Sequence, residues 1–255
     1  MDREEVLHAA AANLAGWHDC SVRALGFPTA TGAWWWTAAT PSPWIYFTAI
    51  EVRRARTRTE RRDALAEVRR HLGDPSGSFE AVCDNFDSLD LDRAGLQRRS
   101  RGRWYARPAG PLDDIPVQPD GVVREATSTD DLAAFERATC LSFAAPPPVA
   151  PGDIHAPGIL DDPAMHVFIG EALPDEGPAG PVVAGAMAYV HGGVVGIYGV
   201  GTVPGHRNQG WATALTTACL AVAPDRPATL QPSAAAAAMY QRLGFVDQGE
   251  YHHWA

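Results

Sequence analysis

The chain has 255 residues, a length that fits one large domain or two small ones. Hydrophobic residues make up 46% and charged residues 20%, which is typical of a folded globular protein and excludes a disordered chain. The formal net charge of -9 disfavours a nucleic-acid binder, because such proteins normally carry a basic face. The acidic balance contributes to solubility or favours cationic or neutral partners.

The four cysteines (Cys20, Cys83, Cys140 and Cys219) are widely spaced and form no C-x-x-C pair. We therefore expect no zinc knuckle, no thioredoxin-type site and no disulfide framework. The N-terminus is acidic and lacks the basic region of a signal peptide, and no run of 18 apolar residues occurs. These features predict a cytoplasmic protein.

In the N-terminal half, apolar residues recur at helical spacing over residues 3–18, and turn residues follow at 26–31. Aromatic and β-branched residues predict two strands around a turn at 40–43. The expected elements are strands at 33–37 and 44–52, a helix at 61–72, a strand at 78–83, a short helix at 89–95 and a strand at 101–107.

Two features of this half allow either a structural or a functional interpretation. The basic run at residues 53–62 is a solvated helix entry or a phosphate site. The consecutive residues Trp34, Trp35 and Trp36 cannot all be buried on one face of a strand. They are therefore strand core, or one of them is exposed at an interface or a substrate wall.

A proline-rich segment separates the two halves. Four prolines at 108, 111, 116 and 119 forbid a helix or a central strand there. We therefore predict an accessory domain at 1–107, a linker at 108–120 and a second domain at 121–255.

The second half is more regular. Ser128 is expected to cap a helix, and residues 144–163 form a long proline-rich loop of the kind that is often functional. The expected strands are 122–126, 165–171, 182–190, 194–200, 228–231 and 245–254, with helices at 209–223 and 234–243 and a hairpin turn at 191–193. This order predicts an α/β fold with a mixed sheet.

The most informative stretch is VGTVPGHRNQGWAT at residues 200–213, in which Arg207, Gly210 and Ala212 form an R-x-x-G-x-A pattern. The backbone N–H groups at residues 208–212 would lie at a helix start without partners and point outward together. Gly210 allows close approach of a ligand, and Arg207 adds charge with bidentate geometry. The pattern is suited to a pyrophosphate.

A second element follows about thirty residues later, with Ser233, Ala236, Met239, Tyr240, Leu243, Gly244 and Phe245. Together the two elements resemble the acyl-CoA-binding motif and following helix of the GCN5-related N-acetyltransferase (GNAT) superfamily, over about 135 residues. The resemblance implies the mixed-sheet acyl-CoA N-acyltransferase fold and acetyl-CoA as co-substrate. The implied binding residues are Val200, Thr202, Val203, Arg207, Asn208, Gln209, Gly210, Trp211, Ala212, Thr213 and Ser233.

The resemblance also implies catalytic roles. Tyr240 matches the tyrosine that protonates the leaving thiolate, the alternative being a core aromatic. Ser233 stands where the family often has Asn, and would hydrogen-bond a pantetheine amide or thiol. Backbone N–H groups near Val200 and Thr202 would hold the thioester carbonyl, on a strand expected to be bulged. Trp211 either covers the adenine or packs outward.

The general base is left open. The strand before the cradle has no carboxylate, and the remaining candidates are Tyr198, His191, His155, Glu171 and Glu250. No metal is expected, because His252 and His253 alternate on the terminal strand and a two-His site lacks its third ligand.

The N-terminal half carries a weaker echo. Residues 94–108 resemble 243–255 at an offset of 149, with Gly95 matching Gly244 and Leu96 matching Phe245. The chain is thus similar to two tandem GNAT-like domains with a degenerate first copy. That copy lacks the R-x-x-G-x-A pattern, so it would bind no cofactor and would wall the substrate site or form a homodimer contact.

The predicted function is transfer of an acetyl group from acetyl-CoA to a primary amine of a small molecule by direct attack. The acidic balance and the loop at 144–163 suggest a cationic acceptor. Two alternatives remain: a non-catalytic acyl-CoA-binding sensor, and a protein acetyltransferase acting on lysine or N-terminal amines. Neither nucleic acid nor a membrane is an expected partner.

Overall fold

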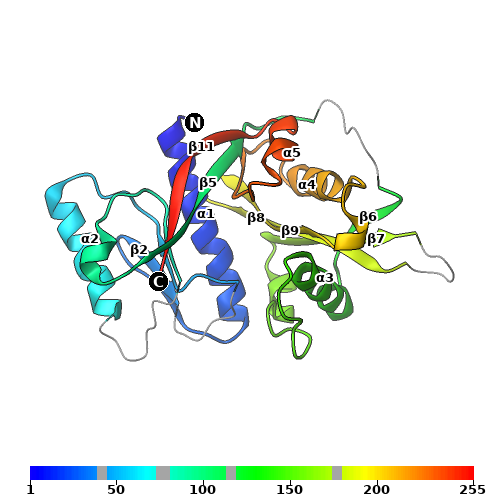
Figure 1. Ribbon diagram of the computed structural model, residues 1–255, viewed down its shortest axis with the longest axis horizontal. Helices are drawn as coiled ribbons and strands as arrows, with labels where there is room; N and C mark the ends of the chain where they lie inside the picture. The colour runs from blue at the N-terminus through cyan, green and yellow to red at the C-terminus, as the bar shows by residue number, and fades with distance from the viewer. Residues whose placement is uncertain (39–44, 73–80, 113–118, 174–179) are drawn as a thin grey trace.

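The computed structural model describes residues 1–38, 45–72, 81–112, 119–173 and 180–255. Within these ranges, strands form a single 11-stranded mixed sheet in the order β1-β2-β3-β4-β11-β5-β10-β9-β8-β7-β6 (Figure 1). Its strands are β1 (Thr29–Thr31), β2 (Trp35–Ala38), β3 (Ala49–Glu51), β4 (Val82–Asp84), β5 (Arg98–Arg107), β6 (Gly121–Glu125), β7 (Met165–Ala172), β8 (Val182–His191), β9 (Val194–Thr202), β10 (Ala228–Leu230) and β11 (Val246–Trp254). The α-helices are α1 (Arg3–Ala24), α2 (Arg58–Leu72), α3 (Thr129–Ser142), α4 (Trp211–Ala221) and α5 (Ala237–Arg242).

Helix α1 lies between the two halves of the molecule (Figure 1). It begins at a reciprocal capping box between Asp2 and Glu5, and it extends to Ala24, beyond the expected end at residue 18. The added turn is stabilised by packing, because Ser21 and Val22 are buried. The expected turn at residues 26–31 was wrong in part, since Thr29–Thr31 forms β1 and pairs with β2.

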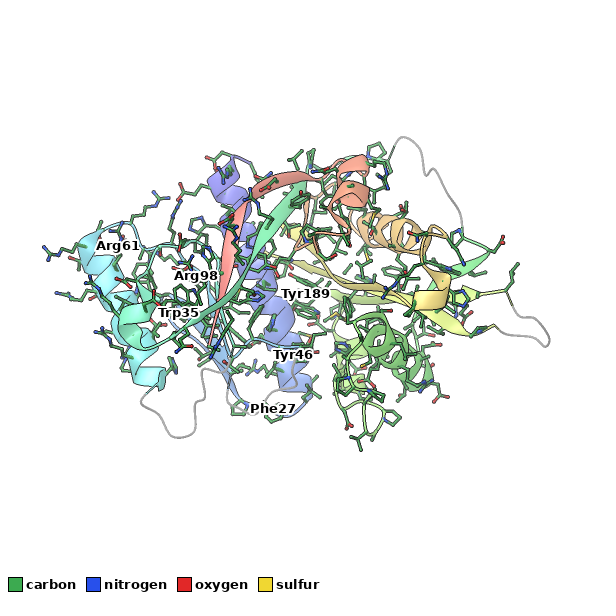
Figure 2. All side chains as sticks on the ribbon, viewed as in Figure 1. Phe27, Trp35, Tyr46, Arg61, Arg98 and Tyr189 are labelled. Atoms are coloured by element: carbon green, nitrogen blue, oxygen red, sulfur yellow. The ribbon has the colours of Figure 1, made fainter. Side chains whose placement is uncertain are left out.

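The three consecutive tryptophans are all buried, which confirms the strand-core alternative and excludes an exposed one. Strand β2 is covered on both faces. Trp36 belongs to the core cluster that contains α1, whereas Trp35 packs in the cluster on the α2 side and donates its indole N–H to the Ala64 carbonyl at 3.3 Å (Figure 2). The alternation of a strand thus places large side chains in two cores instead of one.

The C-terminal half has a helical layer on each face of its sheet (Figure 1). Helices α1 and α3 pack on one face around Leu14, Phe135 and Met187, and α4 and α5 pack on the other around Leu215 and Phe245. Ser128 caps α3 as predicted, and the β8–β9 hairpin turns at Gly192 and Gly193, both with positive φ. The last two helices begin later than expected, at Trp211 and Ala237.

The two halves exchange strands at the centre of the sheet. Strand β5, the last of the predicted first domain, lies between β10 and β11. Strand β11, the last of the chain, lies between β4 and β5. Each half therefore completes its sheet with a strand from the other, and residues 1–107 and 121–255 share one continuous sheet.

The β5–β11 pair is symmetric about an approximate two-fold axis. Gly102 pairs with Tyr251, which is 149 residues further along the chain. On either side of it, Arg101 pairs with His252 and Arg103 pairs with Glu250. Residue 250 is 149 positions after 101, and residue 252 is 149 positions after 103, so the repeat maps each of these two pairs onto the other. The two register shifts, which skip residues 99 and 248, are also 149 residues apart.

The matching glycines are consistent with this internal repeat. Gly95 ends the 3₁₀ helix η1 (Leu91–Ala94) with φ of 92°, and Gly244 follows α5 with φ of 83°. Parallel pairs precede both, β3 with β4 and β9 with β10. The segment from β3 to β5 therefore repeats the order of the segment from β9 to β11.

The predicted mixed α/β fold is confirmed. In the described ranges, none of the helices is long and apolar enough to cross a bilayer. All four cysteines are free thiols. The predicted turn at 40–43 and parts of the predicted strand at 78–83 and the linker at 108–120 lie outside the described residues.

Candidate acyl-CoA site

Strand β9 is bulged where the resemblance predicts a bulge. Its register with β8 shifts between the pairs Gly185–Gly201 and Met187–Tyr198, which leaves one extra residue on β9. Gly199 adopts a φ of 61° there, a conformation that favours glycine. The bulge redirects the backbone of the strand end that carries Val200 and Thr202.

Close to this bulge, the edge of β9 that faces β10 loses its hydrogen-bonded neighbour. The parallel pairing between these strands ends at Ile197 and Leu230, so among the described residues the part of β9 beyond Ile197 has no strand partner on that side. Val203 is already engaged, since its N–H donates to the Val183 carbonyl at 2.8 Å. The residues expected to hold the thioester, Val200 and Thr202, are both half-buried along this open edge.

The loop from β9 to α4 presents a run of free backbone donors. Within the described part of the chain, the N–H groups of residues 208–213 donate no hydrogen bond. Asn208 and Gly210 have φ values of 62° and 93°, and no side chain caps α4. Six consecutive unpartnered amides at a helix N-terminus form a site for an anion.

Arg207 has a different orientation from the one expected. Its Nε donates to the Thr202 carbonyl at 3.2 Å and its Nη2 to the Ser142 carbonyl at 2.8 Å. The guanidinium thus ties the loop to β9 and to the end of α3, and its bidentate edge is not free for a phosphate. Its role in binding a pyrophosphate stays a prediction.

Trp211 was wrongly expected to cover the adenine or to pack outward. Its indole is only 1% exposed and belongs to the core cluster beneath α4. The ring lies against two glycines, because a methyl group on Gly170 would lie 2.6 Å from its Cε3 and one on Gly121 would lie 2.6 Å from its Cη2. Only the backbone N–H of Trp211 can contribute to the cradle.

The other predicted binding residues are accessible. Asn208 and Gln209 are exposed, and Ala212 and Thr213 are half-buried in the first turn of α4. Ser233 is exposed in the turn before α5, where its carbonyl accepts the Ala236 N–H at 3.0 Å. Its role toward the pantetheine stays a prediction.

Tyr240 lies in the core between α4 and α5. It is 5% exposed, and its ring meets that of Phe245 edge-on at a centroid distance of 5.8 Å. Burial raises the pKa of the phenol well above its ordinary value, although a hydrogen bond with Thr216 partly opposes the shift. The phenol is therefore neutral over the physiological range and retains a proton that it can donate.

Most of the general-base candidates are engaged elsewhere. The Tyr198 hydroxyl donates to Asn13 Oδ1 at 2.6 Å, and Glu171 pairs with Arg124 at 2.6 Å. Glu250 pairs with Arg103 at 3.0 Å, and His191 is exposed at the end of β8.

His155 differs from these four. It is fully buried, with Nδ1 2.6 Å from the Tyr46 hydroxyl and Nε2 without a partner. Its ring centroid lies 5.4 Å from that of Phe135, a side chain that also reaches the bulge at Gly199. Burial lowers its pKa to about 3, so the imidazole is neutral at pH 7 and is a weaker base than a free histidine.

In the N-terminal half, the loop before α2 corresponds to the loop before α4. A side chain of α2 itself already binds its backbone N–H groups. Glu60 Oε2 accepts the N–H groups of Arg56 and Thr57 at 2.9 and 2.8 Å, at the start of α2. These backbone hydrogen bonds lower the pKa of Glu60. A carboxylate thus occupies backbone donors that would otherwise be available to a phosphate.

Known proteins share both the fold and the motif region. The sequence profile described as "Acetyltransferase (GNAT) family" matches residues 133–245. No curated protein matches the chain.

Three solved structures resemble the chain over most of its length. A GCN5-related N-acetyltransferase from Kribbella flavida is 18% identical, with a TM-score of 0.64 and 94% of each chain covered. A protein from Staphylococcus epidermidis, described as functionally unknown, is 16% identical, with a TM-score of 0.58 and coverage of 88% of this chain and 91% of that one. A tandem GNAT protein from the clavulanic acid biosynthesis pathway is 13% identical, with a TM-score of 0.57 and coverage of 99% and 93%. Residues 133–245 thus match the GNAT family, and the fold of the whole chain resembles that of GNAT proteins, one of which is described as a tandem GNAT protein.

Proposed function

We propose that this chain transfers an acetyl group from acetyl-CoA to a primary amine of a small molecule. The observation that carries the proposal is the run of six unpartnered amides at residues 208–213, which begins directly after the bulged strand β9. These donors fit a pyrophosphate, and the open edge of β9 fits an extended pantetheine arm. Acetyl-CoA would supply the activated thioester carbon there.

The chain's own groups then have two tasks. As the amine nitrogen forms its bond to the carbonyl carbon, the carbon–sulfur bond breaks, the thiolate takes a proton and the amine loses one. A thiol with pKa near 8.5 leaves as thiolate at a cost of about 2 kcal/mol at pH 7. Deprotonating a lysine-like amine costs about 4–5 kcal/mol and is the larger problem.

Tyr240 and His155 are the residues assigned to these tasks. The neutral phenol of Tyr240 would protonate the thiolate, as its match to the family motif implies. His155 would accept the amine proton through its unpartnered Nε2, with Tyr46 fixing the ring through Nδ1. Of the five candidates, His155 combines burial, a free nitrogen and proximity to the bulge.

The N-terminal half supports a small acceptor because its side chains close the inner side of β9. Trp17 of α1 stacks on Tyr198 at a centroid distance of 4.3 Å. Tyr46 contacts His155 in the loop at 144–163, and Glu136 holds this loop by accepting the N–H groups of residues 152, 154 and 155 at 2.7–3.0 Å. These packed contacts cover this face of β9 where a protein acceptor would need an open groove, so they favour a small molecule, and the net charge of -9 favours a cationic one.

The test is release of the CoA thiol from acetyl-CoA in the presence of small amines or of peptides with free amines. The chain contains no lysine, so acetylation of its own lysine side chains cannot contribute. Tyr240→Phe should lower kcat by about 100-fold with little change in KM for acetyl-CoA. Stoichiometric binding without turnover for any amine would contradict the proposal and favour the sensor, and preferential turnover of peptides would favour a protein acetyltransferase.

A further inference from the structure

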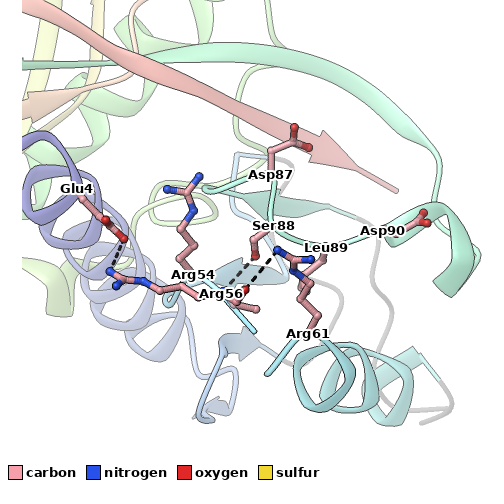
Figure 3. A pocket seen from close by; sticks show the side chains of 9 residues that line it. Glu4, Arg54, Arg56, Arg61, Asp87, Ser88, Leu89 and Asp90 are labelled. Atoms are coloured by element: carbon pink, nitrogen blue, oxygen red, sulfur yellow. Dashed lines mark hydrogen bonds and ion pairs between the residues drawn. The ribbon is translucent and has the colours of Figure 1, made fainter. Parts of the chain in front are cut away.

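Three side chains with metal-binding groups meet where β4 ends. Asp84 is the last residue of β4, Asp87 follows in the next turn, and His252 pairs with Asp84 across the β4–β11 ladder. A carboxylate oxygen of each aspartate and a ring nitrogen of His252 lie within 4.8 Å of one another. Figure 3 shows Asp87 on the loop after β4, next to β11.

Two of these groups are buried and have unpartnered atoms. Asp84 is fully buried; its Oδ1 accepts the N–H groups of Phe86 and Asp87, but its Oδ2 makes no hydrogen bond. His252 is 3% exposed, and its Nδ1 lies 3.3 Å from Asp87 Oδ1 without forming a hydrogen bond. Buried polar atoms are normally hydrogen-bonded, so two unpartnered ligand atoms at one place indicate a missing partner.

Carboxylates also gather at this place. Glu51 is fully buried next to Asp84, which brings two carboxylates together inside the protein. Asp87 Oδ1 lies 3.8 Å from Nη2 of the exposed Arg98, whereas in the described part of the chain no arginine pairs with the buried Asp84, and the sequence has no lysine. A buried carboxylate without a counter-charge is costly, and a divalent cation would offset that cost at Asp84.

Water has access to the same place. A cavity of 320 Å³ is lined by Asp87 and His252, together with Glu250, Arg3 and Arg54. A second cavity of 640 Å³ shares Arg54 and Asp87 with it (Figure 3). Water molecules from these cavities can complete a coordination shell that the protein fills only in part.

We propose that Asp84, Asp87 and His252 bind a first-row divalent cation such as Zn²⁺ or Mn²⁺. One imidazole nitrogen and two carboxylate oxygens match the preferences of these ions. The ligands come from β4, the turn that follows it and the exchanged strand β11, so the ion would fasten the end of the chain to the N-terminal half. The sequence carries no local signal for this ligand set, because the two aspartates lie 165 or more residues before His252 and only the fold brings the three side chains together.

The experiment is titration of the chelator-treated, dialysed full-length protein with ZnCl₂ and with MnCl₂ by calorimetry, and with CoCl₂ by visible absorption. We expect one ion per chain and a rise in the unfolding temperature. Asp87→Asn should weaken binding at least tenfold; Asp87 is exposed, and its positive φ of 48° is one that asparagine tolerates. His252→Gln should abolish the Co²⁺ spectrum.

The matched control is Asp90→Asn, which removes an exposed carboxylate from the same loop. Asp90 pairs with Arg93 at 2.8 Å and lies outside the ligand group, so this variant should bind like the parent. Absence of binding by all three ions would overturn the proposal. So would one-to-one binding that Asp87→Asn leaves unchanged, because the ion would then lie elsewhere.

Discussion

If the Trp211 side chain is part of the core, replacing it should reduce the stability of the fold; if it covers a ligand, replacement should mainly reduce ligand affinity. The indole is 1% exposed and presses against Gly170, where a methyl group would lie 2.6 Å from Cε3 and 2.8 Å from Cζ3. Trp211→Leu should destabilise the fold by about 2–4 kcal/mol, because it removes buried ring atoms and leaves a cavity. Gly170→Ala should cost about 1–3 kcal/mol through overpacking.

The double variant provides the decisive comparison. Leucine vacates the ring edge, so the new methyl group fills space that the single Trp211→Leu variant leaves empty. We expect the double variant to be at least 1 kcal/mol more stable than the sum of the single effects predicts, as measured by denaturant unfolding. Gly158→Ala is the control, since its methyl group would meet only Ala24 Cβ at 3.8 Å. Strict additivity, or a Trp211→Leu variant that keeps its stability but loses acetyl-CoA affinity, would refute this placement.

Two further predictions concern buried polar groups. Asn13 donates to the carbonyls of Tyr189, His191 and Val194 and accepts the Tyr198 hydroxyl, so Asn13→Ala should cost about 2–4 kcal/mol in chemical denaturation, and Tyr198→Phe clearly less; equal losses would contradict the shared network. Burial lowers the pKa of both His18 and His155 to about 3. Between pH 6.5 and 3, these two histidines are therefore protonated in the unfolded chain and neutral in the folded one. Their contribution to stability is complete above pH 6.5 and is lost as the pH falls toward 3. The unfolding free energy should fall by about 1.4 kcal/mol per pH unit for each histidine in this window, and an unchanged slope in a His18→Gln/His155→Gln double variant would disprove the assignment.

Elements with local signals could be predicted from the sequence. Ser128 with Asp131 forms the α3 capping box, and the two glycines at 192 and 193 turn the β8–β9 hairpin. The R-x-x-G-x-A pattern located the free amides at the N-terminus of α4. In each case the residues that determine the conformation are neighbours in the chain.

What could not be predicted depends on distant partners. The three-residue strand β1 exists because β2 pairs with it, and its sequence of Thr, Ala and Thr has no apolar pattern. The fate of Trp211 depended on glycines at 121 and 170, whose lack of a side chain makes room for the ring. The helices before and after β10 are shorter than their periodicity suggested, because residues 207–210 and 234–236 form turns and bends instead of helix.

The exchange of β5 and β11 could not be predicted, because the pairing depends on two segments that are far apart in the sequence. The sequence pointed to it through the weak similarity of the segments around Gly95 and Gly244. The symmetric register about Gly102 and Tyr251, with its two matching irregularities, becomes visible only when β5 and β11 are paired. The exchange also brings His252 to Asp84, a contact that neither half contains by itself.

The most direct test of the central claim is calorimetric titration of the protein with acetyl-CoA, for the parent and for Asn208→Asp. This nearly isosteric change keeps a residue that tolerates the positive φ of 62° and adds one negative charge beside the free amides. A unit charge about 6 Å from a doubly charged pyrophosphate costs about 1.4 kcal/mol in water, or about tenfold in Kd. We predict one-to-one binding that Asn208→Asp weakens about tenfold and that the exposed control Gln97→Glu leaves unchanged. Absence of binding, or equal binding by all three proteins, would contradict an acyl-CoA site at residues 208–213.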